Sequence, residues 1–108
     1  MGNLLAITKE NFEQEVLQSS IPVLLDFWGP KCAPCLALMP EVEELASIYD
    51  GKVKFCKINS AENRRLAMEL KVMSLPTFQF YKDGQLVGQL QTSFGREEIE
   101  AQLKTLIG

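Results

Sequence analysis

The fold of this chain is decided by one stretch, Phe27-Trp28-Gly29-Pro30-Lys31-Cys32-Ala33-Pro34-Cys35. Before it, residues 21–28 are almost continuously apolar and rich in branched and aromatic side chains, which is typical of a strand buried on both faces. Gly29 and Pro30 end that strand, and apolar residues then recur at helical spacing through residues 38–49. The stretch therefore places two thiols where a buried strand gives way to a helix.

The two thiols are expected to differ in reactivity because they differ in position. Cys32 is predicted at the amino-terminal end of the helix, where the first backbone amides lack partners and the helix dipole is positive. Both effects stabilise a thiolate, so Cys32 is the expected nucleophile. Cys35 follows about one turn later, close enough to form a disulfide with Cys32 but deeper and less activated. It is the expected resolving thiol.

The cysteine count limits the alternatives for this pair. The chain has three cysteines and no histidine, whereas a closed zinc site needs four ligands. A structural thiol pair, half of a zinc site, or half of an iron–sulfur site shared by two chains are the alternatives. A Cys-x-x-Cys among strand and helix patterns favours a redox pair, with no metal and no cofactor. The third thiol, Cys56, lies between Phe55 and Ile58 in a predicted strand and is expected to be a small buried residue.

Composition indicates the general class of protein. A length of 108 residues with 46% hydrophobic residues fits a single domain, 1–108, with its own core. The net charge of -3 and the lack of a basic stripe argue against a nucleic-acid partner. The apolar run at residues 4–7 is far too short for a signal peptide or a membrane span. We expect a soluble, cytoplasmic monomer with no membrane partner.

Strand and helix patterns alternate through the first two thirds of the chain. The predicted elements are a strand at 3–7, a helix after Thr8, a strand at 21–28, a helix ending near Tyr49, a strand at 53–59 and a short helix that begins within residues 60–63. Thr8 is expected to cap the first of these helices. Pro40 lacks the amide that helical hydrogen bonding requires, so it is expected to kink the second helix.

The last third of the chain predicts an antiparallel pair instead. Residues 77–81 and 85–90 are joined by Asp83-Gly84, a favourable pair for a tight hairpin. A closing helix follows, with acidic residues in its first turn. Alternation followed by a hairpin predicts an α/β fold, with a mixed sheet and helices on both faces.

From end to end the chain closely resembles the thioredoxin family. The motifs that carry the resemblance are Asp26-Phe27-Trp28, Cys32-Ala33-Pro34-Cys35, Pro40, Lys57, Leu75-Pro76-Thr77 and Lys82-Asp83-Gly84. The resemblance implies a thioredoxin-like fold, in which four helices flank a five-stranded mixed sheet. It also implies reduction of protein disulfides through a mixed-disulfide intermediate, with a flavoprotein reductase as the source of electrons.

The resemblance also gives roles to a carboxylate and a lysine. Asp26 lies among apolar neighbours, which should raise its pKa, although a polar residue at a strand end is an equally simple interpretation. The family likeness implies that Asp26 takes the proton from Cys35. Lys57, on the next strand, would by itself be interpreted as a solvated side chain, and only the likeness pairs it with Asp26.

Four further residues are expected to shape a substrate groove. The resemblance implies that Pro76 follows a cis peptide bond beside Cys32, and that the backbone of Leu75 pairs with an extended substrate. Trp28 is expected both to pack in the core and to form a wall of the site. Pro34 should restrain the start of the helix, where its missing donor is not needed.

Three residues depart from the usual family pattern. Lys31 and Ala33 replace a tryptophan and a glycine around the first cysteine, and Thr92 lies where a glycine usually lines the groove. These changes leave the reacting residues in place and alter the surface around them. They therefore predict an atypical flavoprotein reductase or atypical substrates. Three hypotheses follow: a general disulfide reductase, an electron carrier for one specific partner, or a non-catalytic binding module.

Overall fold

The computed structural model describes residues 4–108, which form a five-stranded sheet in the order β1-β3-β2-β4-β5. Its strands are β1 (Leu5–Ala6), β2 (Val23–Trp28), β3 (Lys54–Asn59), β4 (Thr77–Lys82) and β5 (Gln85–Gln91). β3 runs parallel to both β1 and β2, whereas β4 is antiparallel to β2 and β5 to β4. The predicted mixed sheet is confirmed. Asn3, the predicted start of the first strand, lies outside the described residues.

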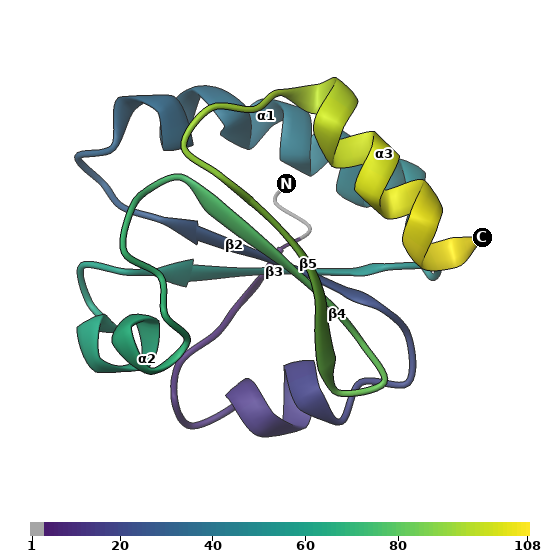
Figure 1. Cartoon of the computed structure of the whole chain (residues 1–108), viewed down its shortest axis with the longest axis horizontal. Helices are drawn as coiled ribbons and strands as arrows, with labels where there is room; N and C mark the ends of the chain where they lie inside the picture. Colours follow the sequence, from purple (N-terminus) through teal and green to yellow (C-terminus); the bar gives the residue numbers. More distant parts are fainter. Residues whose placement is uncertain (1–3) are drawn as a thin grey trace.

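Helices cover both faces of this sheet (Figure 1). The helices of residues 4–108 are η1 (Glu13–Leu17), α1 (Ala33–Ile48), α2 (Arg64–Glu69) and α3 (Arg96–Ile107). Figure 1 shows α1 and α3 on one face, with α2 and the purple helix η1 on the other. The expected α/β fold with four flanking helices is thereby confirmed. No helix within residues 4–108 combines the length and the apolar character needed to cross a bilayer.

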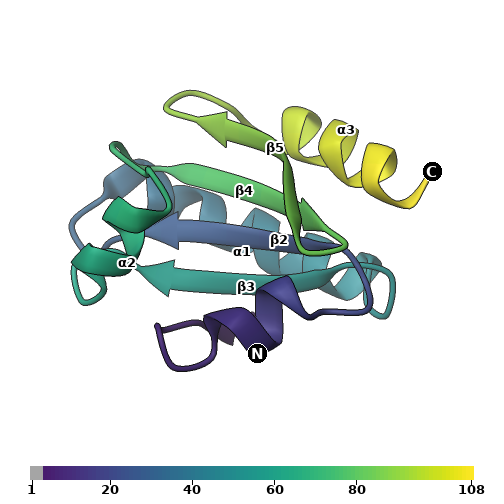
Figure 2. The same ribbon diagram turned by 60° about the horizontal axis from the view of Figure 1, so that its bottom comes forward.

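The central strand β2 supplies side chains to two separate cores. Leu24 packs with α1 and α3 residues such as Val42 and Ile99, whereas Leu25 and Phe27 pack in the core on the opposite face. This alternation follows from the two-residue period of a strand, and it explains why the sequence of β2 is apolar throughout. Figure 2 shows β2 lying between β3 and β4, which shields both of its edges.

The helix predicted after Thr8 begins later than expected, at Glu13, and differs in type. The Gln18 amide donates to the Glu13 carbonyl at 2.9 Å, a hydrogen bond that spans five residues and is typical of a π-helix. Thr8 does not cap this helix, because its hydroxyl accepts instead from the Glu10 amide in the preceding turn. The sequence correctly indicated the helix, but its expected cap was wrong.

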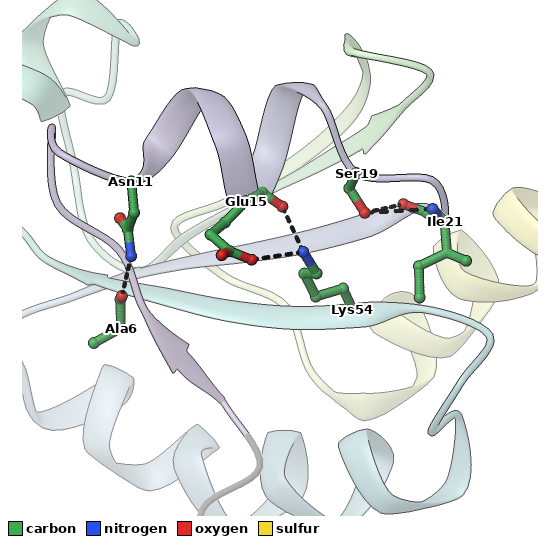
Figure 3. Close-up of polar contacts among 6 residues, drawn as sticks. All are labelled: Ala6, Asn11, Glu15, Ser19, Ile21 and Lys54. Carbon is green, nitrogen blue, oxygen red and sulfur yellow. Dashed lines mark hydrogen bonds and ion pairs between the residues drawn. The ribbon is translucent and has the colours of Figure 1, made fainter.

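Side-chain contacts hold η1 against the sheet (Figure 3). The Lys54 ammonium donates to the backbone carbonyl and to the carboxylate of Glu15, at 2.9 Å in each case. Before the helix, the Asn11 amide donates to the Ala6 carbonyl at 3.1 Å. These bonds connect η1 and the turn before it to β3 and β1.

The β4–β5 hairpin has the turn that its sequence predicts. Asp83 and Gly84 both have positive φ, 54° and 78°, as a two-residue turn of this kind requires. A Cβ on Gly84 would lie 2.9 Å from the Leu17 carbonyl oxygen, so glycine is also required by space. In α1, the helix continues through Pro40 to Ile48, and the expected kink stays a prediction.

Candidate active site

The two thiols of the quoted stretch form a disulfide at the junction of β2 and α1. Cys32 is the N-cap residue of α1, and Cys35 lies in its first turn. The Cys35 amide donates to the Cys32 sulfur at 3.2 Å, so that sulfur satisfies one of the free donors at the helix start. The same amide is placed to stabilise a thiolate once the disulfide is reduced.

The exposure of the two sulfur-bearing residues is unequal. Cys32 is half-buried beside the exposed Lys31, Ala33 and Pro34, whereas Cys35 is only 2% exposed. A partner therefore reaches Cys32 first, while Cys35 is covered. This asymmetry is what an entering nucleophile and a resolving thiol require.

A buried carboxyl group lies in the middle of β2. Asp26 is 2% exposed, and its Oδ1 lacks a hydrogen-bond partner among the described residues. Burial raises the pKa of Asp26 to about 7, against the opposing effect of the Lys57 ammonium. Since Asp26 has the strand parity of Leu24, it faces the side of the sheet that α1 covers. A carboxyl that titrates near neutral pH can accept or release a proton there.

Lys57 lies next to Asp26 in the register of the sheet. Asp26 and Lys57 are Cα partners on the parallel strands β2 and β3, so both side chains point to the same face. Lys57 is half-buried, and within residues 4–108 no hydrogen bond or ion pair joins it to Asp26. Its influence on the carboxyl group is therefore electrostatic and acts through space.

A cis peptide bond and a strand end lie together on the groove side. The Leu75–Pro76 bond is cis, Pro76 is buried and Leu75 is half-buried. The Thr92 amide donates to the Pro76 carbonyl at 3.0 Å, and Thr92 itself is exposed with a positive φ of 74°. The structure thus brings Thr92 beside Pro76.

Gly29 has a spatial role that its place at the strand end did not reveal. It is buried, and a Cβ built on it would lie 3.2 Å from Cδ1 of Leu75. Leu75 therefore packs on the backbone that leads to Cys32. Both residues, together with Cys32, line one open hollow.

The polar groups around this end of the sheet are incompletely paired. Within residues 4–108, three buried side-chain atoms lack a hydrogen-bond partner: Asp26 Oδ1, Trp28 Nε1 and Ser60 Oγ. Trp28 is half-buried at the end of β2, and its carbonyl accepts from the Ser60 amide at 2.8 Å. Buried unpaired groups are rare and are commonly found at functional sites.

The third thiol lies outside this arrangement. Cys56 is 0% exposed in β3, and burial raises the pKa of its thiol to about 12. This confirms that Cys56 is a small buried residue, as expected. Elsewhere in residues 4–108, no three His, Cys, Asp or Glu side chains gather in a way that could hold a metal ion.

Most of the expected site residues lie at one end of the sheet, and five further residues, which include Pro30 and Ala61, join them. Gly29, Ser60 and Arg64 line the hollow beside Cys32 but were not identified from the sequence as site residues. Ser60 and Arg64 follow β3 and carried no motif, so only the packing of α2 beside the β2–α1 connection brings them near the disulfide.

Comparison with known proteins gives consistent matches. The family model described as Thioredoxin matches residues 3–105. The chain is 44% identical to "Thioredoxin" of Peptoclostridium acidaminophilum, over 97% of this chain and 96% of that protein. It is 42% identical to "Thioredoxin" of Acetoanaerobium sticklandii, over 94% and 97% of the two chains. "Thioredoxin 1" of Synechococcus elongatus is 49% identical over 76% of this chain and 77% of that protein.

Proposed function

The chain belongs to the thioredoxin family and is a thiol-disulfide oxidoreductase, and from this premise we propose specific roles for its residues. In the reduced protein, the Cys32 thiolate attacks one sulfur of a substrate disulfide. A mixed disulfide forms, and the other substrate sulfur leaves as a thiolate that takes up a proton. The contact between the Cys35 amide and the Cys32 sulfur is the observation that carries this assignment.

The second half of the reaction uses the buried residues. Asp26 accepts the proton of Cys35, and the resulting thiolate attacks the Cys32 sulfur. This forms the Cys32–Cys35 disulfide and releases the reduced substrate, so the two electrons pass from the protein to the substrate. Support comes from the pKa of Asp26, which at about 7 suits proton transfer near neutral pH. Lys57 tunes that pKa from β3.

Substrate binding is assigned to the exposed and half-buried residues around Cys32. In this proposal the backbone of Leu75 pairs with an extended substrate segment, while Pro76 and Thr92 shape the groove beneath it. Trp28 forms a wall, and Pro34 fixes the start of α1.

Exposed Lys31 and Ala33 contact partners directly in this proposal and set their specificity.

The electron donor, the oligomeric state, the compartment and the substrates are also part of this proposal. Each turnover leaves the Cys32–Cys35 pair oxidised, so a two-electron donor is needed, and we assign this task to a flavoprotein reductase. The chain is proposed to act as a single-domain monomer, 1–108, in the cytoplasm. Substrates are proteins that bear disulfides.

A reduction assay tests the assigned roles. Wild type and the variants Cys32→Ser, Cys35→Ser and Cys56→Ala are compared for reduction of a protein disulfide by a chemical dithiol. Cys32→Ser should lose catalysis, Cys35→Ser should accumulate a mixed disulfide visible by mass spectrometry, and Cys56→Ala should keep wild-type activity. Undiminished catalysis in both active-site variants would show that the pair does not carry the reaction.

A further inference from the structure

An open hollow of about 510 Å³ lies directly beside Cys32. Its walls come from three segments: the β2–α1 connection, the start of α2, and Leu75 before β4. Figures 1 and 2 both show these segments at the same end of the sheet. A partner that presents a disulfide to Cys32 therefore comes next to this hollow.

Two cations from different segments line the hollow. Lys31 comes from the β2–α1 connection and Arg64 from α2, and both are exposed. Neither side chain forms a hydrogen bond or ion pair with any residue of 4–108. No carboxylate lines the hollow, although the chain as a whole has a net charge of -3. The region next to the nucleophile is thus locally positive on an acidic protein.

A second, smaller hollow of about 280 Å³ continues from the first. The two share Ser60, Arg64 and Leu75 as lining residues. The second hollow also has Met68 and Met73 on its rim, which are 70% and 89% exposed. Exposed methionines are flexible and polarizable, and they adapt to apolar side chains of different shapes.

We propose that Lys31 and Arg64 select partners with an acidic residue near the disulfide cysteine that Cys32 attacks. The partner's segment is extended, its carboxylate lies between the two cations, and an apolar side chain beyond it packs on Met68 and Met73. Charge complementarity carries the choice of occupant, because the hollow supplies two unpaired cations and no anion. This inference rests on the proposed reductase function and adds a substrate class to it.

The neighbouring residue Arg65 provides a comparison for Arg64. Arg65 does not line the hollow beside Cys32. It lines another hollow together with Glu62 and Glu69, and Arg64 lines both hollows. It has the same charge as Arg64 and is equally exposed on the same helix. Arg65 is therefore a matched control for effects of net charge alone.

The test uses two synthetic peptides, each closed by one disulfide, that differ only in glutamate or glutamine beside one cysteine. Pre-reduced protein is mixed with each peptide, the reaction is quenched with acid, and the second-order rate constant is measured. At low salt, wild type should reduce the acidic peptide about tenfold faster, since exposed ion pairs each contribute about threefold. The ratio should fall toward one in about 1 M salt.

Variants then assign the preference to residues. Arg64→Gln and Lys31→Gln should each lower the acidic-to-neutral ratio about threefold, the double variant should abolish it, and Arg65→Gln should leave it unchanged. A wild-type ratio of one, or an equal loss in Arg65→Gln and Arg64→Gln, would overturn the inference. Failure to reduce either peptide would overturn the proposed reductase function along with it, a result distinct from equal reduction of both.

Discussion

The two ends of the sheet differ in how completely their polar groups are paired. At the turn end, where β3 begins and β4 meets β5, the hairpin has the expected Asp83-Gly84 and two lysines have partners within the protein. Lys54 binds Glu15, and Lys82 donates to the Leu106 carbonyl at 3.0 Å. At the disulfide end, where β2 and β3 finish, buried polar atoms lack partners within residues 4–108.

Backbone conformation shows the same contrast. The turn end uses glycine at a positive φ of 78°, whereas the disulfide end has Thr92, a β-branched residue, at a positive φ of 74°. Thr is poorly suited to that conformation because its side chain crowds the backbone. The residue type suits its backbone conformation at the turn end but not at the disulfide end. Such conflicts concentrate at functional sites. We therefore expect substitutions that relieve such conflicts to stabilise the protein only when they are made at the disulfide end.

The largest expected effect comes from Asp26→Asn. The folded-state pKa of about 7 lies above the ordinary value of 3.8, so the ionised carboxylate destabilises the fold. In wild type, stability should fall as pH rises from about 4 to about 7 and then level off. The amide does not ionise, so the variant should be more stable above pH 7, by up to about 4 kcal/mol. Denaturant unfolding of the oxidised proteins at several pH values measures this gap.

An exposed carboxylate serves as the control for that experiment. Asp50→Asn alters an exposed residue in the turn after α1 and should produce no comparable gap. If Asp26→Asn were instead less stable than wild type at pH 8, Asp26 would be a structurally paired group, and the contrast between the two ends would lose its main support.

The sequence indicated the thiol pair and its place at a helix start, but not all of the residues around it. For Asp26 the sequence left burial and a polar residue at a strand end as equally simple interpretations, and the structure shows a carboxyl that is 2% exposed. The spacing of the cysteines predicts a disulfide at a helix start. Thr92 gave no sign of positive φ, because that conformation is usually signalled by glycine or asparagine. Arg64 could not be recognised because one exposed arginine looks like any other until α2 packs beside Cys32.

The fold shows a similar division between local and distant information. The hairpin and the alternation of strands and helices are local patterns, and both were predicted. The strand order β1-β3-β2-β4-β5 was available only through family likeness, because periodicity does not specify which strands pair. The π-helical form of η1 was missed because the spacing of apolar residues indicates a helix without specifying its hydrogen-bond pattern.

An intermediate effect is expected for Thr92→Gly. Glycine adopts a φ of 74° freely, whereas the β-branched threonine is strained there, by about 1 to 3 kcal/mol. Part of that gain is offset by the greater chain entropy of glycine when unfolded, about 0.5 to 1 kcal/mol. The free energy of unfolding should therefore rise by about 1 kcal/mol, measured by urea denaturation.

The matching substitution at the turn end should act in the opposite direction. Gly84→Ala places a side chain at a φ of 78° and 2.9 Å from the Leu17 carbonyl oxygen, so stability should fall by at least about 1 kcal/mol. A loss of stability in Thr92→Gly would instead mean that the threonine side chain contributes packing that outweighs its conformational strain.

The smallest effect, and the sharpest test of independence, is expected for Glu15→Gln. The Glu15–Lys54 pair spans 2.9 Å, and both side chains are about 30% exposed, so solvent screening limits its contribution to about 0.5 kcal/mol. Glutamine removes the charge but leaves the backbone carbonyl of Glu15 to accept from the Lys54 ammonium. Stability should therefore drop slightly at low salt and match wild type at about 1 M salt, because the ionic contribution is screened there.

Disulfide reduction should proceed at the wild-type rate in Glu15→Gln, since the Glu15–Lys54 pair lies at the turn end and the reaction occurs at the disulfide end. A slower reaction in a fully folded variant would show that the ends are energetically coupled, and the unpaired groups around Cys32 would then have to be explained together with the contacts of η1.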